Sequence, residues 1–338
     1  MKKLFIASLA LASLFYGCSK SKPDVNPTQT NGVTTYVGNG TPGLVNGSGT
    51  GAELNEPVDL AVDASGNLYI SDEGNNVIRK VAPGGAVTTF AGDGTAGYKD
   101  GAGTAAEFNG PEGIVIDETG NVYVADSQNK VIRKITSSGV VSTYAGSGTS
   151  GYLDGPGTTA EFATPNGLAI DKSRNIYVAD VSNNVIRKIS SGGTVSTYAG
   201  TGAAGSANGA ASSASFHFPS GVTVDPSGNL FVVETANGDV REISTGGQVT
   251  TFATGLLGPI RVTIDGASSL YASCGDNTIQ KIDNTGKVST YAGSGSPGYS
   301  DGSLLLSQFT EPAGLIANTQ GVVIVADYGN NRIRVLTP

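Results

Sequence analysis

Three oxygen-bearing side chains stand where successive copies of a recurring pattern begin in this chain. Glu56, Glu112 and Asn166 each lie directly beside a proline that opens a short apolar segment. Carboxylate and amide oxygens are the ligands that Ca²⁺ takes in proteins. Segments that begin at one shared level would gather these side chains around a single opening. The residue types therefore predict a polar ligand site there, with Ca²⁺ as the candidate cofactor.

The elements that would position these side chains belong to a module that occurs six times. A complete module has a proline-led apolar segment, a Gly-Asn type turn, a second apolar segment that usually ends in an acidic residue, and two further strand-like segments. The first three intervals are each 54 residues long. The opening prolines are Pro57, Pro111, Pro165, Pro219, Pro259 and Pro312.

Four short strands joined by tight turns form one twisted antiparallel sheet, and repeats of this length with four strands are typical of propeller blades. The fifty glycines suit the number of turns that such a fold needs. Residues 33–37 resemble an outer strand but precede every inner strand, while the last module stops after its third strand. We therefore expect an all-β, six-bladed β-propeller of four-stranded antiparallel blades, closed by an N-terminal strand that completes the C-terminal blade.

The third module carries a family resemblance most clearly. It reads PNGLAID at 165–171, NIYVAD at 175–180 and NNVIRK at 183–188. Over residues 31–338 the chain resembles the NHL-repeat β-propellers, a family that includes sensors, interaction platforms, RNA binders and a few enzymes. The resemblance implies the fold far more firmly than any activity.

A narrower resemblance concerns the gluconolactonase propellers, in which a glutamate, asparagines and an aspartate hold a divalent metal. Glu56 and Asn166 match that pattern, and Glu112 could substitute for a further ligand. Ser220 stands where the aspartate is expected, which puts the lactonase activity in doubt. A cation without catalysis is the alternative interpretation of these residues.

Several other residues recur too regularly to form one site. An aspartate closes the second strand and an arginine lies on the third in most modules, so we expect turn hydrogen bonds or ion pairs within a blade. Tyr98, Tyr152 and Tyr299 recur in the connections between modules, each before an apolar anchor that we expect to pack between blades. The alternative is that these tyrosines stack on sugar rings.

Departures from the repeat are the better guide to a binding site. The connection before Pro259 is about 14 residues shorter than the other five, which predicts a gap in the rim beside the channel. Near it, Arg261 replaces a recurrent glycine, and Glu234 and Cys274 replace the recurrent aspartate. The predicted ligand-binding residues at the channel mouth and rim gap are Glu56, Asp59, Glu112, Asn166, His217, Glu234, Arg261 and Cys274.

The chain offers little of the chemistry that enzymes use. His217 is the only histidine, so it cannot supply a multi-histidine zinc site alone. Cys274 lacks a partner histidine nearby in the sequence and is most simply a small buried hydrophobe. We therefore predict no catalytic residue. The formal net charge of −8 disfavours nucleic acid as a partner.

The N-terminus predicts export. Lys2 and Lys3 precede an apolar run that ends near Gly17 and Cys18, a pattern typical of a lipoprotein signal at 1–17 with lipidation of Cys18. The run is too short to span a bilayer. Residues 18–30 are polar with two prolines and read as a flexible tether to the membrane. The residue after Cys18 is Ser19 and not the aspartate associated with inner-membrane retention. This favours the outer membrane.

The sequence is compatible with three functions. The leading one is a monomeric, lipid-anchored envelope protein that binds a protein, peptide or glycan on the loop-rich face of the propeller. The alternative is a divalent-metal-dependent lactonase or related hydrolase that uses Glu56, Glu112 and Asn166. The third is a purely structural envelope component.

Overall fold

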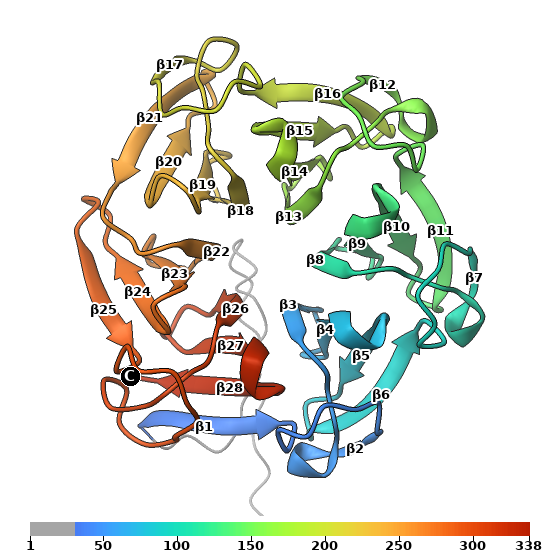
Figure 1. Cartoon of the computed structure of the whole chain (residues 1–338), viewed down its shortest axis with the longest axis vertical. Helices are drawn as coiled ribbons and strands as arrows, with labels where there is room; N and C mark the ends of the chain where they lie inside the picture. Colours follow the sequence, from blue (N-terminus) through green and yellow to red (C-terminus); the bar gives the residue numbers. More distant parts are fainter. Residues whose placement is uncertain (1–30) are drawn as a thin grey trace, which may run out of the picture.

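The computed structural model describes residues 31–338; the predicted signal segment, Cys18 and the tether lie outside this described part. Six antiparallel sheets surround a central channel, with the inner strand of each sheet beside the channel (Figure 1). Among residues 31–338, no helix is long and apolar enough to cross a membrane. The predicted all-β, six-bladed propeller is confirmed.

The blades follow one another around the ring in chain order. Blade 1 contains β2 (Gly47–Ser48), β3 (Pro57–Val62), β4 (Leu68–Asp72), β5 (Val77–Val81) and β6 (Ala86–Ala91). Blade 2 contains β7 (Gly101–Ala102), β8 (Pro111–Ile116), β9 (Val122–Asp126), β10 (Val131–Ile135) and β11 (Val140–Ala145). Blade 3 contains β12 (Gly155–Pro156), β13 (Pro165–Ile170), β14 (Ile176–Asp180), β15 (Val185–Ile189) and β16 (Thr194–Ala199).

The remaining blades include the two that differ most from the repeat. Blade 4 contains β17 (Gly209–Ala210), β18 (Pro219–Val224), β19 (Leu230–Glu234), β20 (Asp239–Ile243) and β21 (Gln248–Ala253). Blade 5 contains β22 (Pro259–Ile264), β23 (Leu270–Cys274), β24 (Thr278–Ile282) and β25 (Val288–Ala292). Blade 6 contains β26 (Pro312–Ala317), β27 (Val323–Asp327), β28 (Arg332–Thr337) and β1 (Gly32–Val37).

Short 3-10 turns connect several of these strands. They are η1 (Gly49–Gly51), η2 (Glu73–Asn75), η3 (Gly103–Ala105), η4 (Ser127–Asn129), η5 (Gly157–Thr159), η6 (Val181–Asn183) and η7 (Tyr328–Asn330). Turns such as η2 join the second and third strands of a blade, and turns such as η1 lie in the long connections between blades.

The first and last parts of the described chain close the ring, as predicted. β1 pairs antiparallel with β28, with Val33 opposite Leu336, and both Val33 and Val37 are buried. On the inner side, Glu56 N donates a 2.8 Å hydrogen bond to Asn331 Oδ1. Asn331 has a φ of 53°, a left-handed conformation that asparagine tolerates. Closure therefore combines a strand pairing with a link between blades 6 and 1.

Packing between neighbouring blades supplies the core. Each buried cluster joins apolar side chains of two adjacent blades; one, for example, contains Leu60 and Ile70 of blade 1 with Ile324 and Val335 of blade 6. The predicted apolar anchors at the ends of the long connections are completely buried, which confirms that they pack between blades. These anchors are Leu54, Phe108, Phe162, Phe216 and Phe309.

Four blades carry a fifth strand that the repeat did not predict. A two-residue strand from each long connection pairs with the outer strand of the blade that follows it: β2 with β6, β7 with β11, β12 with β16 and β17 with β21. In blade 6 the same place is taken by a single bridge between Gly302 and Val33. The long connections therefore cover part of the exposed outer edge in every blade except blade 5, which follows the short connection.

Candidate functional site

Neighbouring inner strands approach one another closely at the third position of the strand. Gly113, Gly167, Gly221 and Gly314 occupy this position in four blades. A Cβ added at Gly167 would lie 2.5 Å from the Ser220 carbonyl oxygen of the next blade, and similar clashes arise at the other three. Glycine is therefore required there by the close approach of neighbouring backbones.

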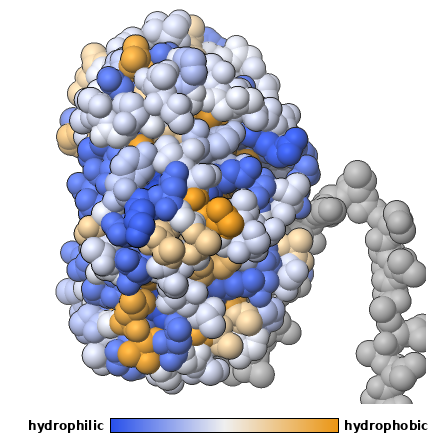
Figure 2. All heavy atoms as spheres, turned by 90° about the vertical axis from the view of Figure 1, so that its right-hand side faces the viewer, coloured by the Kyte–Doolittle hydropathy of each residue, from blue (hydrophilic) through white to orange (hydrophobic). Residues whose placement is uncertain are grey.

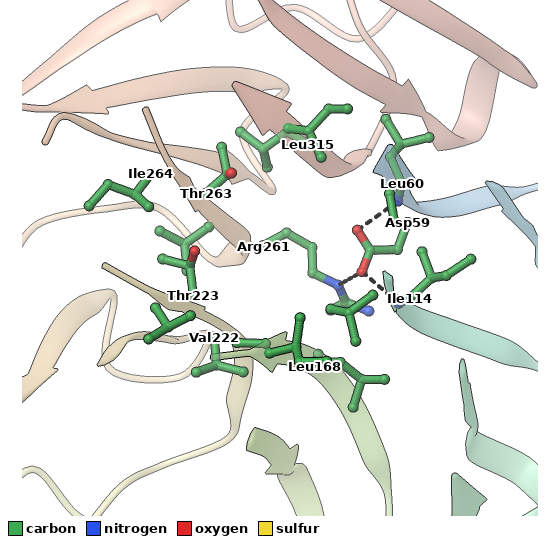
Figure 3. A pocket seen from close by; sticks show the side chains of 18 of the residues that line it. Asp59, Leu60, Ile114, Leu168, Val222, Thr223, Arg261, Thr263, Ile264 and Leu315 are labelled. Carbon is green, nitrogen blue, oxygen red and sulfur yellow. Dashed lines mark hydrogen bonds and ion pairs between the residues drawn. The ribbon is translucent and has the colours of Figure 1, made fainter. Parts of the chain in front are cut away.

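The two blades without this glycine place opposite charges at the same position. Asp59 on β3 and Arg261 on β22 are both buried, and Arg261 Nε lies 3.8 Å from Asp59 Oδ2. Figure 3 shows the Arg261 side chain extending across the channel toward Asp59, with apolar side chains of the other blades around them. The pair thus lies across the channel at its narrow level.

Further contacts hold both side chains in place. Asp59 accepts hydrogen bonds from the backbone N–H groups of Leu60 at 2.9 Å and Ile114 at 3.2 Å. Arg261 donates to the Ser220 carbonyl at 3.2 Å and to Glu112 Oε2 at 3.2 Å. Burial raises the pKa of the Asp59 carboxyl, while the Arg261 charge opposes that rise. A buried carboxylate needs such a partner, and Arg261 provides it.

Glu112 and Asn166 meet beside this pair, as the sequence predicted for neighbouring inner strands. Asn166 Nδ2 donates a hydrogen bond to Glu112 Oε2, the same oxygen that accepts from Arg261. Arg261 therefore supplies positive charge to Glu112 and Asp59 together. Among residues 31–338, no three His, Cys, Asp or Glu side chains are grouped so that they could hold a metal ion. The Ca²⁺ site at Glu56, Glu112 and Asn166 stays a prediction.

Two residues of the mouth were missed in the sequence. Burial, together with the charges of Glu112 and Glu56, raises the pKa of Glu73 to about 7, although Arg261 opposes this. Burial also raises the pKa of Tyr328, with Glu73 and Glu56 next in effect. Both residues follow the second strand of their blade, where the others have Ser127, Val181, Thr235 and Gly275. Comparing this position across the repeats would have singled out Glu73 as the acidic one.

The residues directly before the opening prolines form a second ring at the mouth. Glu56 and Glu311 occupy it in blades 1 and 6, whereas Phe218 occupies it in blade 4. All three are exposed and have positive φ values of 52° to 55°, a conformation that is costly for such side chains. His217, half-buried, packs its ring on Phe218 with a centroid distance of 4.9 Å. The mouth is therefore acidic on blades 6, 1 and 2 and aromatic on blade 4.

Beyond the Asp59–Arg261 pair, the channel is apolar. A cavity of about 210 Å³ is lined by leucine, isoleucine and valine side chains of all six inner strands. Thr223 and Thr263 contribute its two hydroxyl groups, visible in Figure 3. The charged pair thus separates an acidic mouth from an apolar channel.

The recurrent acidic residues and arginines have a structural role in five of the six blades, as the repeat suggested. Asp126, for example, accepts from Asn109 N at 2.8 Å and from Arg133 Nη1 at 2.7 Å, and both side chains are fully buried. Arg133 also donates to Asp100 of the long connection at 2.8 Å. The same ion pairs occur between Asp72 and Arg79, Asp180 and Arg187, Glu234 and Arg241, and Asp327 and Arg334.

Glu234, predicted at the ligand site, therefore lies in the blade interior. Its side chain is fully buried and accepts a 3.0 Å hydrogen bond from Arg241 Nη1 and a 2.6 Å hydrogen bond from His217 N. Although the glutamate side chain is one methylene longer than aspartate, Glu234 makes the same ion pair with the arginine of its blade that aspartate makes in other blades. The structure does not bring Glu234 together with Asp59, Glu112 and Arg261.

Cys274 also lies away from the mouth, in the core between blades 4 and 5. Burial raises the pKa of its thiol to about 12, which disfavours the reactive thiolate. The third strand of this blade carries Gln280 where the other blades carry arginine. The short connection explains both changes, because it lacks the long loop that binds the arginine elsewhere. The short connection and the residues Cys274 and Gln280 therefore belong to one coordinated departure of blade 5 from the repeat.

The short connection does not leave its position empty. Leu256 is buried in the same cluster as Cys274 and takes the place of the apolar anchors of the other blades. Its N–H donates to the Gly238 carbonyl at 2.9 Å, and Gly275 N donates to the Leu257 carbonyl at 3.0 Å. The predicted rim gap is therefore a packed turn at this level.

The tyrosines of the long connections bind within the protein. The Tyr98 ring lies 5.1 Å from the Arg133 guanidinium carbon, and its hydroxyl is 2.8 Å from Thr143 Oγ1. Tyr152 makes the equivalent contacts with Arg187 and Thr197. These contacts give each tyrosine a structural partner in its own blade; stacking on sugars stays a prediction.

Comparisons with known proteins agree with the fold. The NHL repeat family model matches residues 54–80, 108–135, 162–189 and 309–336, which belong to blades 1, 2, 3 and 6. "NHL repeat-containing protein 2" from Bos taurus is 29% identical over 335 residues, an alignment that covers 83% of this chain and 46% of that protein. "Protein SUPPRESSOR OF QUENCHING 1, chloroplastic" from Arabidopsis thaliana is 40% identical over 90 residues, covering 26% and 8%. The chain thus spans less than half the length of these relatives.

Solved structures share the propeller at low identity. An auxiliary nutrient binding protein from Bacteroides ovatus has a TM-score of 0.68 and 16% identity, covering 91% of this chain and 76% of its own. A gluconolactonase from Xanthomonas campestris has a TM-score of 0.62 and 13% identity, covering 85% and 87%. A streptogramin B lyase has a TM-score of 0.59 and 13% identity, covering 90% and 96%. At such identities the likeness establishes the fold alone.

Proposed function

We propose that this chain is a lipid-anchored cell-envelope binding protein whose channel mouth takes a positively charged segment of a protein or peptide. The observation that supports it most is the mouth itself, where Glu56, Glu73, Glu112 and Glu311 converge. The nearest guanidinium, Arg261, is already paired with Asp59 and Glu112. The mouth therefore has unneutralised negative charge for a cationic partner.

The opposite side of the mouth supports a peptide over a glycan. Phe218 exposes 46% of its surface and is held in a costly backbone conformation. The residue before the opening proline has a positive φ in five of the six blades, so the fold itself presents the Phe218 ring at the mouth. Lysine and arginine combine a charged head with an apolar stem, so one such side chain could meet both the carboxylates and the aromatic ring.

The experiment that tests this function measures peptide binding to the mouth. Lysine- or arginine-rich peptides, matched acidic peptides and neutral oligosaccharides are titrated against the wild type and against Glu56→Gln/Glu112→Gln. The matched control is Glu118→Gln, an exposed glutamate just after the other end of an inner strand. Binding of basic peptides that weakens at least ten-fold in the double variant alone supports the proposal. Equal binding by both variants would refute it.

Anchoring needs its own test. Cys18→Ser should release the chain from the membrane fraction and abolish incorporation of a labelled fatty acid, while the outer-membrane fraction should hold the wild type. A wild-type chain found in the soluble fraction would contradict the proposed anchor but would not bear on the proposed peptide site.

A metal-dependent hydrolase remains the second candidate, favoured by the contact between Glu112 and Asn166 at the mouth. A cation there would compete with Arg261 for the Glu112 carboxylate. Calcium and EDTA titrations followed by thermal unfolding test it, together with a lactone and ester screen. Metal-dependent turnover that disappears in Glu56→Ala and Asn166→Ala would establish the hydrolase.

A further inference from the structure

Two leucines on the outer edge of blade 6 have no role in the packing of the fold. Leu305 exposes 58% and Leu306 exposes 76% of its surface, whereas the preceding Leu304 packs against the core. They lie in the long connection from β25 to β26. Two adjacent leucines exposed to this degree are costly in water, so they call for an explanation beyond folding.

The other four long connections provide internal comparisons for this turn. In each connection the glycine after the outer strand donates a hydrogen bond to the first residue of the equivalent turn. Gly92 N donates to the Gly103 carbonyl, and Gly293 N donates to the Leu304 carbonyl. The equivalent three-residue segments are Gly49–Gly51, Gly103–Ala105, Gly157–Thr159 and 211–213, with the sequence ASS in the last.

None of these segments contains a large apolar residue, so the turn does not need one. Figure 2 shows an edge that includes blade 2, where hydrophobic residues lie singly or in small groups among hydrophilic ones. Leu305 and Leu306 are therefore specific to blade 6.

Blade 6 is also where the N-terminal part of the chain joins the propeller. Val33 N donates to the Gly302 carbonyl at 2.7 Å, and Gly302 N donates to the Val33 carbonyl at 3.0 Å. The start of β1 thus lies within a few residues of Leu305 and Leu306. Residues 19–31 hold one large apolar side chain, Val25, so this segment has little with which to cover the leucines.

We infer that Leu305 and Leu306 form a membrane-contact surface that inserts into the bilayer beside the lipid on Cys18. This inference rests on the proposed lipid anchor. The 14 peptide bonds that join Cys18 to Gly32 span at most about 50 Å when the chain is extended, so the edge of blade 6 stays close to the bilayer. Such tethering gives a local concentration in the millimolar range, at which a weak contact is occupied.

The contact would orient the propeller. Insertion of an outer edge holds the disc upright on the membrane, with blade 3 on the far side of the ring and both ends of the channel open to the surroundings. The acidic mouth is then accessible to a partner in the envelope. Each leucine is expected to favour the inserted state by about ten-fold, as for the transfer of one large aliphatic side chain from water.

The absence of tryptophan from the chain allows a direct test. Leu305→Trp introduces a single fluorophore into the full lipidated chain, reconstituted in phosphatidylethanolamine and phosphatidylglycerol vesicles. The matched control is Thr158→Trp, the equivalent position in blade 3. Lipids brominated on their acyl chains should quench the Leu305→Trp emission and leave the Thr158→Trp emission unchanged. Equal quenching of both, or of neither, would overturn the inference.

Flotation separates this result from failure of the anchor. A chain that floats with vesicles but whose Leu305→Trp emission is not quenched keeps its anchor and loses the membrane-contact surface. A chain that does not float refutes the anchor on which the inference rests. Blue-shifted Leu305→Trp emission in the absence of vesicles would show that a second copy covers the leucines, which also overturns the inference.

Discussion

Asp59 and Arg261 come from blades 1 and 5 and meet across the channel, with Arg261 Nε 3.8 Å from Asp59 Oδ2. They occupy the one inner-strand position that is glycine in every other blade. Two blades therefore depart from the consensus glycine at the same inner-strand position, and the two replacing residues carry opposite charges. Each substitution explains the other, since either charge alone would be buried without its partner.

The first prediction concerns removal of one member of this pair. Arg261→Met should lower the free energy of unfolding by about 3 kcal/mol, because it leaves Asp59 and Glu112 near each other without a cation. Asp59→Asn should cost less, about 1 kcal/mol, since Glu112 still pairs with Arg261 and the amide oxygen can still accept from Leu60 and Ile114. Urea unfolding at pH 7 measures both changes.

The control for this prediction restores the repeat. Asp59→Gly/Arg261→Gly gives all six inner strands the consensus residue and removes both charges together. We expect it to be more stable than Arg261→Met. A double variant as unstable as the single one would mean that the side chains stabilise the ring by packing and not by charge.

The second prediction tests the account of blade 5. Cys274→Asp places a carboxylate in a fully buried position without an arginine and should lower the free energy of unfolding by about 3 kcal/mol or more. Adding Gln280→Arg should recover part of the loss by recreating the ion pair of the other blades. Thermal unfolding of the wild type, the two single variants and the double variant gives the coupling between the sites.

Only part of the site could be predicted from one sequence. The fold followed from six copies of a module with a fixed order of turns, and the closing strand followed from counting outer strands. Comparison of equivalent repeat positions also singles out Arg261 and predicts that Glu112 and Asn166 lie at the same channel mouth. Such inferences succeed because equivalent positions in a propeller share one level and one direction.

The errors arose where several positions change together. The predicted place of Cys274 among the ligand residues is wrong, because the change from arginine to Gln280 on the next strand accompanies it. The predicted place of Glu234 is wrong because its side chain points into the blade toward Arg241, which residue type alone does not reveal. No local sequence pattern indicates the raised pKa of Glu73, because it depends on burial and on Glu112 and Glu56 in other parts of the chain.

The third prediction concerns pH. Glu73 ionises near pH 7 in the folded protein but near its ordinary value of 4.5 when unfolded. The folded state therefore holds the proton more tightly, and its stability falls as the pH rises from about 4.5 to 7. Glu73→Gln should remove this loss and make the protein more stable than wild type at pH 8, by about 1 kcal/mol after solvent screening.

Chemical denaturation at pH 5 and pH 8 measures the effect, with Glu118→Gln as the control. Binding of basic peptides should also strengthen between pH 6 and pH 8 in the wild type, as Glu73 becomes charged. The same pH dependence in Glu73→Gln would assign the titration to another group.

The fourth prediction concerns ring closure. Deletion of residues 31–40 removes β1 and exposes the edge of β28, so the melting temperature should fall by more than it does when a surface loop of similar length is deleted. Val33→Asp should act in the same direction, because Val33 is buried against blade 6 and blade 5. The control Val140→Asp alters an exposed valine on an outer strand. Equal melting temperatures for the two valine variants would contradict the closure.

The pairing of β1 with β28 also determines when the protein can be complete. During synthesis β1 is the first strand of the propeller to appear, whereas its partner β28 (Arg332–Thr337) follows all the strands of blades 1 to 5. Blades 1 to 5 can assemble locally in order, while β1 waits unpaired until β28 is made. Such long-range pairing is slow and leaves an open strand edge. Assembly of this propeller should therefore end, as it began, at its N-terminal strand.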